Sequence, residues 1–279
     1  MTTVESATTG LRARREGEPS RFQILLASVR AEWTKLRSVR STAWSLLVTL
    51  VITIGLGALF CAARVSRWDR LDPGERLNFD PTSFSLNGLF LAQLAIGVLG
   101  VLVISSEYTT GQIRASLGAV PQRRTMLAAK VIVFSVVTFV VGLIACLSAF
   151  AIGQSIFTAK HAGVSLSDPS VLRAVIGGGL YLAVLGAFGI GLGAILRRTA
   201  GAIATLVGFL LVLPILVNFL PSPWNDDIGR YLPGQAGGAI FQVVRDSNSL
   251  GPWTGFAVFC AYAAVALVLG AVLLSRRDA

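Results

Sequence analysis

Six stretches of the chain are long and almost purely apolar. A helix needs roughly 20 apolar residues to cross the hydrocarbon core of a bilayer, so each stretch predicts a membrane-spanning helix. Lys130 is the only charge within these stretches, and its place near one end predicts a side chain that reaches the membrane interface. We therefore expect an all-α integral membrane protein with six transmembrane helices. Their predicted bounds are about 43–63, 86–105, 128–153, 174–196, 200–220 and 253–274.

A different pattern precedes the first span. Between residues 21 and 38, apolar residues recur at steps of three and four, and charged residues flank or oppose them. This spacing puts the apolar residues on one face of a helix. We expect an amphipathic helix that lies in the membrane interface, with the lipid bilayer as its partner. The apolar face consists of Phe22, Leu25, Leu26, Val29, Trp33 and Leu36.

Residues 1–20 are polar and lack the apolar core of a cleavable signal. We expect a disordered cytoplasmic tail there. The remainder, 21–279, is expected to form one six-span transmembrane domain that begins with the interfacial helix.

Charge predicts the orientation of this domain. The net charge is +10, and only 14% of residues are charged, far fewer than in a soluble domain. If the N-terminus is cytoplasmic, the segments on that side hold sixteen Lys and Arg against six acids, and the other side holds eight of each. Basic loops face the cytoplasm, so both termini of this multi-pass cell-membrane protein should lie there. Since the basic residues are not interleaved with aromatics on one face, we expect no nucleic acid as partner.

Motifs for enzyme chemistry are missing from the sequence. There is no GxxxxGK[ST] phosphate loop, no GxSxG and no HExxH, and a single histidine with three widely spaced cysteines does not predict a metal site. Ion-coupled carriers usually keep ionisable residues near the middle of the membrane, and none is present there. We expect a chain that is not an enzyme and binds no cofactor, and whose energy comes from a separate ATPase.

Two further segments carry structural predictions. Gly189 and Gly193 form a GxxxG step in the fourth span, which favours close helix packing. The surrounding glycines imitate a dinucleotide-binding loop, but no strand precedes them. In the loop after the fifth span, residues 236–244 are apolar over too short a distance to cross the membrane. This segment is either a short surface helix or a re-entrant piece.

Two motifs carry a family resemblance. One is EWTKLRSVRST at residues 32–42, and the other is SEYTTGQIR at 106–114, which continues to Arg124. With a weaker YLPG echo at 231–234, they resemble the permease subunits of type-2 ABC exporters, in particular an actinobacterial-like branch. The resemblance implies a homo- or heterodimer of six-span permeases bound to ABC ATP-binding subunits, which carry ATP and Mg²⁺. The substrate is not indicated.

The same resemblance makes the loop after the second span the contact with the ATPase. Locally, Gly111 is suited to end the second helix, and 112–117 is long enough for a turn of helix. Glu107 and Arg114 are placed for charged contacts within the loop or with the ATPase, although the arginines could serve only as topology charges. The expected coupling residues are Glu107, Tyr108, Gly111, Arg114, Leu117, Pro121 and Arg124.

Two other functions stay open from the sequence. A non-transporting membrane anchor or sensor would recruit a cytoplasmic partner through the basic loops. A secondary carrier would instead use an ion gradient, and the lack of buried charge and of obvious inverted repeats disfavours it.

Overall fold

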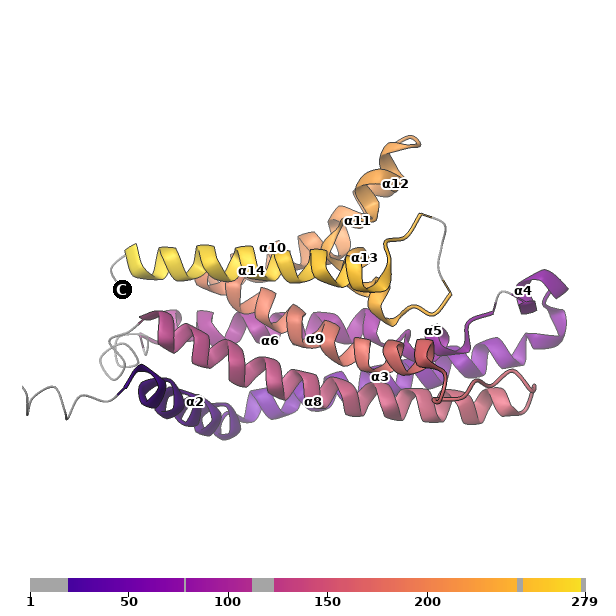
Figure 1. The fold of residues 1–279 in the computed structure, drawn as a ribbon, viewed down its shortest axis with the longest axis horizontal. Helices are drawn as coiled ribbons and strands as arrows, with labels where there is room; N and C mark the ends of the chain where they lie inside the picture. The colour runs from indigo at the N-terminus through magenta and orange to yellow at the C-terminus, as the bar shows by residue number, and fades with distance from the viewer. Residues whose placement is uncertain (1–19, 78, 112–122, 245–247, 277–279) are drawn as a thin grey trace, which may run out of the picture.

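The computed structural model describes residues 20–77, 79–111, 123–244 and 248–276. The structure is 84% helical, without strands in this described part. Six helices in it are long and apolar enough to cross a membrane, and they lie side by side (Figure 1). The predicted all-α membrane fold is therefore confirmed. The six are α3 (Arg40–Ser66), α6 (Leu89–Thr109), α8 (Arg123–Thr158), α9 (Pro169–Leu196), the run Thr199–Asn218, and α14 (Pro252–Arg276).

The bundle has two distinct ends. We call the end that holds α2 (Arg21–Ser38) and the last turn of α14 the terminal end, and the other the opposite end (Figure 1). Several helices extend past the apolar stretches, because helical hydrogen bonding continues through polar residues. Helix α6 instead begins later than predicted, at Leu89, because Asn87 and Gly88 separate it from the short α5 (Pro81–Leu86). Residues 1–19 of the predicted tail 1–20 lie outside the described residues, and Ser20 is the N-cap of α2.

Helix α9 is the centre of the bundle. It packs against α6, α8 and α14 and is the most buried of the six long helices. Gly189 and Gly193 both face α6. A Cβ atom on Gly189 would lie 2.5 Å from the carbonyl oxygen of Gly97, and one on Gly193 would lie 2.6 Å from Cγ2 of Ile104. Only glycine permits such an approach of the two helices.

The fifth span is interrupted by a π-helical turn. It consists of α10 (Thr199–Val207), the turn η2 (Gly208–Val212) and α11 (Leu213–Asn218). Pro214 has no N–H to donate to the carbonyl of Leu210. The backbone N–H of Leu213 donates to Gly208 O, five residues back, as in a π-helix. Beyond α11, the short α12 (Trp224–Gly229) projects away from the bundle (Figure 1).

The apolar part of the last loop re-enters the bundle. It forms α13 (Pro233–Gly238) and η3 (Ala239–Phe241), which pack against α9 and α14. A Cβ on Gly237 would lie 2.6 Å from the ring of Phe259, which is about 10 Å along α14 at 1.5 Å per residue. The segment is thus packed between helices of the bundle, and whether it re-enters the membrane stays a prediction.

Two charged side chains hold the end of this re-entrant segment. Arg173 donates from Nη1 to Ile240 O at 3.1 Å and from Nη2 to Gln242 O at 3.0 Å. On the other side, Asp80 Oδ2 accepts from the backbone N–H groups of Val243 and Val244 at 3.3 and 3.2 Å. The segment is therefore fixed to both α9 and the start of α5.

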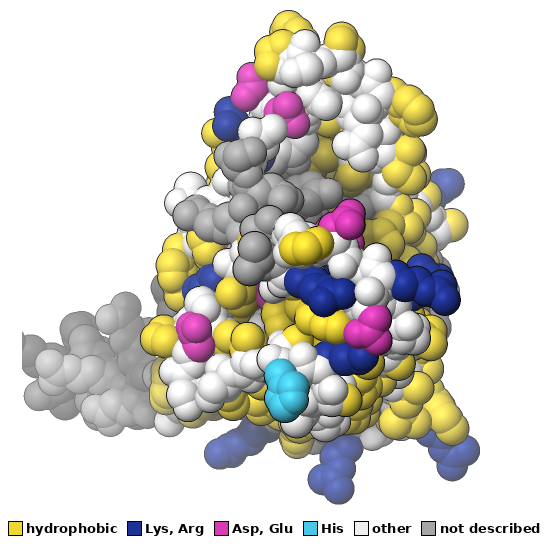
Figure 2. Space-filling model, turned by 90° about the vertical axis from the view of Figure 1, so that its right-hand side faces the viewer, with side chains coloured by type: hydrophobic (Ala, Val, Ile, Leu, Met, Phe, Trp, Pro, Cys, Tyr) yellow, Lys and Arg dark blue, Asp and Glu magenta, His cyan; other side chains and the backbone are white. Residues whose placement is uncertain are grey.

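Figure 2 shows the opposite end face-on. Basic and acidic side chains lie beside one another on this face, and the flanks of the bundle are largely apolar. One of these pairs joins Lys160 Nζ to Asp69 Oδ2 at 2.7 Å, and it lowers the pKa of the Asp69 carboxyl. An apolar flank between polar ends is the surface that a bilayer requires.

Candidate functional site

The amphipathic segment forms the helix α2. Its first turn is closed by a capping box: Ser20 Oγ accepts from Gln23 N at 3.2 Å, and Gln23 Oε1 accepts from Ser20 N at 2.9 Å. These bonds satisfy two backbone groups that a helix start leaves open. The helix then packs along α8.

The packing of α2 divides its apolar face. Leu25, Val29 and Leu36 are half-buried, whereas Phe22, Leu26 and Trp33 are 66%, 40% and 50% exposed. The face turned to the bundle is the polar flank of this stripe, with Ser28 buried and Glu32 directed inward. An exposed apolar edge next to a packed polar flank suits a helix that touches lipid, and its place in the membrane interface stays a prediction.

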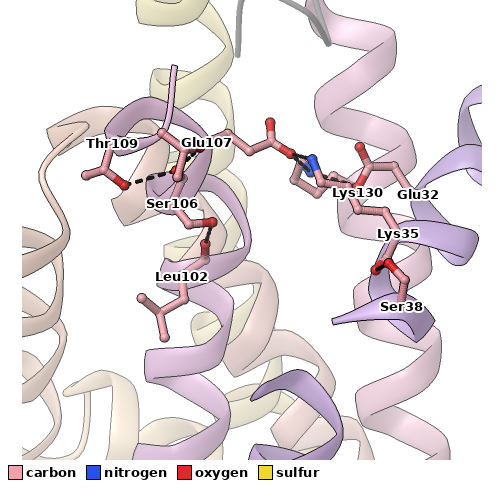
Figure 3. Close-up of polar contacts among 9 residues, drawn as sticks. Glu32, Lys35, Ser38, Leu102, Ser106, Glu107, Thr109 and Lys130 are labelled. Atoms are coloured by element: carbon pink, nitrogen blue, oxygen red, sulfur yellow. Dashed lines mark hydrogen bonds and ion pairs between the residues drawn. The ribbon is translucent and has the colours of Figure 1, made fainter. Parts of the chain in front are cut away.

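A cluster of four charges, two of them fully buried, lies where α2, α6 and α8 meet (Figure 3). Lys130 Nζ on α8 is 2.8 Å from Glu107 Oε1 on α6 and 2.7 Å from Glu32 Oε2 on α2. Lys35 on α2 also pairs with Glu107 Oε1. The side chains of Glu107 and Lys130 are each 1% exposed. Two lysines and two glutamates leave the cluster neutral, as burial of charge requires.

This cluster bears on two expectations. The ammonium group of Lys130 is not exposed, because two carboxylates bind it where α2, α6 and α8 meet, and its position relative to the membrane interface stays a prediction. Glu107 makes its charged contacts with Lys35 of α2 and Lys130 of α8, which the sequence did not predict, and a contact with residues 112–122 or with an ATPase stays a prediction. Its second oxygen, Oε2, is buried and has no hydrogen-bond partner among the described residues.

The neighbours of Glu107 connect the last turn of α6 to the rest of the terminal end. Ser105 Oγ lies 3.0 Å from Thr199 Oγ1, at the start of α10. The guanidinium of Arg197 lies 5.1 Å from the centre of the Tyr108 ring, within the range of a cation–π contact. Within four residues, α6 thus contacts α2, α8 and the junction between α9 and α10.

Two arginines also bind the end of α14. Arg123 donates from Nη1 to Leu274 O at 2.8 Å, and Arg197 donates from Nη2 to Leu273 O at 3.2 Å. Basic groups are favourable at a helix C-terminus, where the carbonyls have no partner within the helix. These arginines therefore have structural contacts in addition to any effect on topology.

The loop that follows α6 is described at its two edges. α6 ends at Thr109, and Gly111 has a φ of 71°, a left-handed conformation that favours glycine. Arg124 is exposed in the first turn of α8. Arg114, Leu117, Pro121 and the predicted helical turn at 112–117 lie outside the described residues. The structure thus brings Glu107 and Tyr108 into the terminal cluster and leaves Arg124 on the surface.

The sequence reasoning missed Glu32, Lys35 and Lys130 as members of this site. Lys130 was one available signal, because a lysine inside a predicted span needs either a route to water or a buried acid. Glu107 lies at the end of the neighbouring span on the same predicted side of the membrane. The pairing of these two residues could therefore have been proposed, although the contribution of α2 could not.

A comparison with known protein families identifies the family of this chain. A sequence profile described as "ABC-2 family transporter protein" matches residues 28–214, more than half of the chain. The chain belongs to this family. The match covers all four residues of the charged cluster and ends in α11. A search of curated proteins found no match.

Membership of the ABC-2 family defines the general role of the chain. Such proteins are the non-catalytic transmembrane components of transporters that work with an ATP-binding subunit. This chain is accordingly a multi-pass transmembrane permease. The family membership disfavours both alternatives, the anchor or sensor and the secondary carrier.

Proposed function

We propose that the chain is the permease subunit of an ABC exporter and moves its substrate with energy from ATP hydrolysed on a separate subunit. The observation that carries the proposal is the anchoring of both helices next to residues 110–122. Glu107 lies in the last turn of α6, Lys130 lies two turns into α8, and their charged atoms are 2.8 Å apart. A push on the loop between them would act on both helices at once.

The energetics of burial support transmission through this cluster. Removal of one member of a buried ion pair costs about 3–5 kcal/mol, because the remaining charge loses its partner without gaining water. Separation of α6 from α8 would expose or strand the charges of Glu107 and Lys130 in the same way. The two helices and α2 therefore move together under a load smaller than this cost.

The remaining parts of the proposal concern orientation and partners. The terminal end faces the cytoplasm, where the ATP-binding subunit docks on the loop between α6 and α8. ATP and Mg²⁺ bind to that subunit rather than to this chain, whose sequence has no GxxxxGK[ST] phosphate loop. A second permease subunit, identical or related, completes the membrane part. The excess of positive charge on the proposed cytoplasmic side supports this orientation.

Co-purification tests the proposal. The tagged chain is expressed with candidate ABC-class ATP-binding subunits from the same organism, and the purified material is reconstituted in lipid nanodiscs. We expect a stable complex whose ATP hydrolysis is blocked by vanadate and falls when the loop is altered by Gly111→Val. If the two proteins separate on size exclusion and the ATP-binding subunit has the same activity alone, the proposal is wrong.

A further inference from the structure

A cavity of about 370 Å³ lies at the opposite end of the bundle, far along α6 from the charged cluster. Its walls come from the start of α6, from η2 and α11, and from the re-entrant α13. A second cavity of about 280 Å³ adjoins it and shares Pro214, Asn218, Gln235 and Gln242. Small-molecule sites in proteins commonly have volumes of about 300–1,000 Å³.

The chemistry of the larger cavity is unusual for a membrane protein. None of its described lining residues is charged, and five of them carry side-chain amides. The rest of the wall is mainly aliphatic or aromatic, as at Leu89, Phe90 and Ile215. The amides belong to Asn87, Gln93, Asn218, Gln235 and Gln242.

One of these amides is built into the wall. Gln93 is 6% exposed; its Nε2 donates to Phe90 O at 2.9 Å, and its Oε1 accepts from the hydroxyl of Tyr181. Tyr181 is itself buried between the re-entrant segment and α14, where its ring stacks on that of Phe259. The hydrogen-bonded Gln93 and Tyr181 therefore form a fixed polar part of the cavity wall.

The other four amides have free hydrogen-bonding capacity. Asn87, Asn218 and Gln235 are exposed, Gln242 is half-buried, and none of the four side chains hydrogen-bonds to another residue in the described part of the chain. A polar group without a partner costs several kcal/mol in hydrocarbon. The four amides are therefore available to water or to a polar ligand in the cavity.

From this lining we propose that the cavity is a substrate site for an uncharged amphiphile, with hydroxyl or amide groups on an apolar body. Each side-chain amide both donates and accepts, so four of them match a ligand with several neutral polar groups. An ionic group in the larger cavity would lose its water without meeting an opposite charge among the described lining residues, which is unfavourable; Asp226 and Arg230 line only the adjoining cavity. This inference rests on the proposed transport function, since it names the class of molecule that is moved.

Protection of an introduced cysteine tests the site in the permease alone. Asn218→Cys is placed in a Cys260→Ser background, because the other two cysteines are buried. The protein in nanodiscs is treated with a maleimide in the presence of an alkyl glucoside, an alkyl trimethylammonium or an alkyl sulfate of equal chain length. Concentrations are matched by the amount bound per nanodisc. Trp224→Cys is the control, because Trp224 is 63% exposed and lines neither cavity.

We expect the alkyl glucoside to slow labelling of Asn218→Cys by at least about fivefold, the equivalent of one neutral hydrogen bond, and to leave Trp224→Cys unaffected. The charged amphiphiles should give little protection. Asn87→Leu and Gln235→Leu should each raise the glucoside concentration for half protection by about fivefold. Equal protection by all three amphiphiles, or an unchanged half-protection concentration in both Leu variants, would overturn the inference.

The outcome is independent of the proposed function, because the assay contains no ATP-binding subunit. If the cysteine is not protected but the permease still forms an active ATPase complex, only the proposed substrate class is wrong. If the cysteine is protected but no complex forms, the ATP-coupled function is wrong and the binding site stands.

Discussion

Glu107 and Lys130 lie on the two helices that border residues 110–122, and their charged atoms are 2.8 Å apart inside the terminal end. The loop thus leaves α6 two residues after an anchored glutamate and enters α8 less than two turns before an anchored lysine. Lys35 and Glu32 extend the same cluster to α2. A partner that moves this loop would therefore move three helices together.

The first prediction concerns the stability of the cluster. Lys130→Met should lower the free energy of unfolding by about 3–5 kcal/mol, because Glu32 then loses its lysine partner and Glu107 keeps only its contact with the half-exposed Lys35. Thermal unfolding in detergent measures the change. Lys160→Met is the matched control: its partner Asp69 is exposed, so we expect little effect.

A double substitution measures the interaction between Glu107 and Lys130 separately from the effects of their other neighbours. With Glu107→Gln added, Lys130→Met should be less harmful than the two single effects together, since no buried charge remains unpaired between them. Strict additivity of the two changes would show that the residues do not interact.

A second prediction concerns the loop. Gly111 has a φ of 71°, where a β-branched side chain is strained, so Gly111→Val should misdirect the chain as it leaves α6. Arg114→Lys keeps the charge and loses the planar guanidinium that binds carboxylates in a bidentate manner. Both variants should insert normally and lower coupled ATP hydrolysis at least about tenfold, a loss equal to about 1.4 kcal/mol. Normal activity of both in the assembled complex would exclude this loop as the coupling element.

The orientation of the bundle gives a third prediction. Single cysteines at Arg70, Ser165 and Asp227 should react with an impermeant maleimide added to intact cells, because these positions lie at the opposite end. Arg124→Cys should react only after permeabilisation. Arg124 is a better probe than Arg123, whose guanidinium binds the end of α14. Labelling of Arg124→Cys in intact cells would show that the proposed topology is wrong.

The apolar edge of α2 gives a fourth prediction. Leu26→Glu with Trp33→Glu should reduce the amount of assembled permease sharply, because two charges would enter a surface that we place against lipid. The control is Ala27→Glu with Thr34→Glu, which adds the same charge on the exposed polar side of the helix. Quantitative blotting of the membrane fraction gives the readout. Equal levels of the two double variants would show that α2 does not contact the bilayer.

Much of this architecture could be predicted from hydropathy alone. A run of about 20 apolar residues has few structures available to it other than a membrane-spanning helix, so the six spans follow from local sequence. Hydropathy does not locate the ends of the helices, because helical hydrogen bonds continue into polar residues, as at both ends of α8. The break at Asn87 and Gly88 is not visible in hydropathy, although an Asn-Gly pair is typical of a turn.

The polar contacts inside the bundle could not be predicted in this way. Glu32 and Lys130 are far apart in the sequence, and they meet only because α2 packs on α8. The π-helical turn before Pro214 depends on hydrogen bonding that an apolar pattern does not reveal. The depth of α13 depends on Gly237 and Gly255, which allow it to approach α14, and on the bonds from Arg173.

Site-specific photo-crosslinking tests the central claim most directly. A photoreactive amino acid is introduced at Leu117, in the loop after α6, and separately at Asp227, at the opposite end. The permease is expressed with the ATP-binding subunit, and the complex is irradiated after purification. Our account predicts a crosslink to the ATP-binding subunit from position 117 and none from position 227. An assembled complex that crosslinks from position 227, or from neither position, would contradict it.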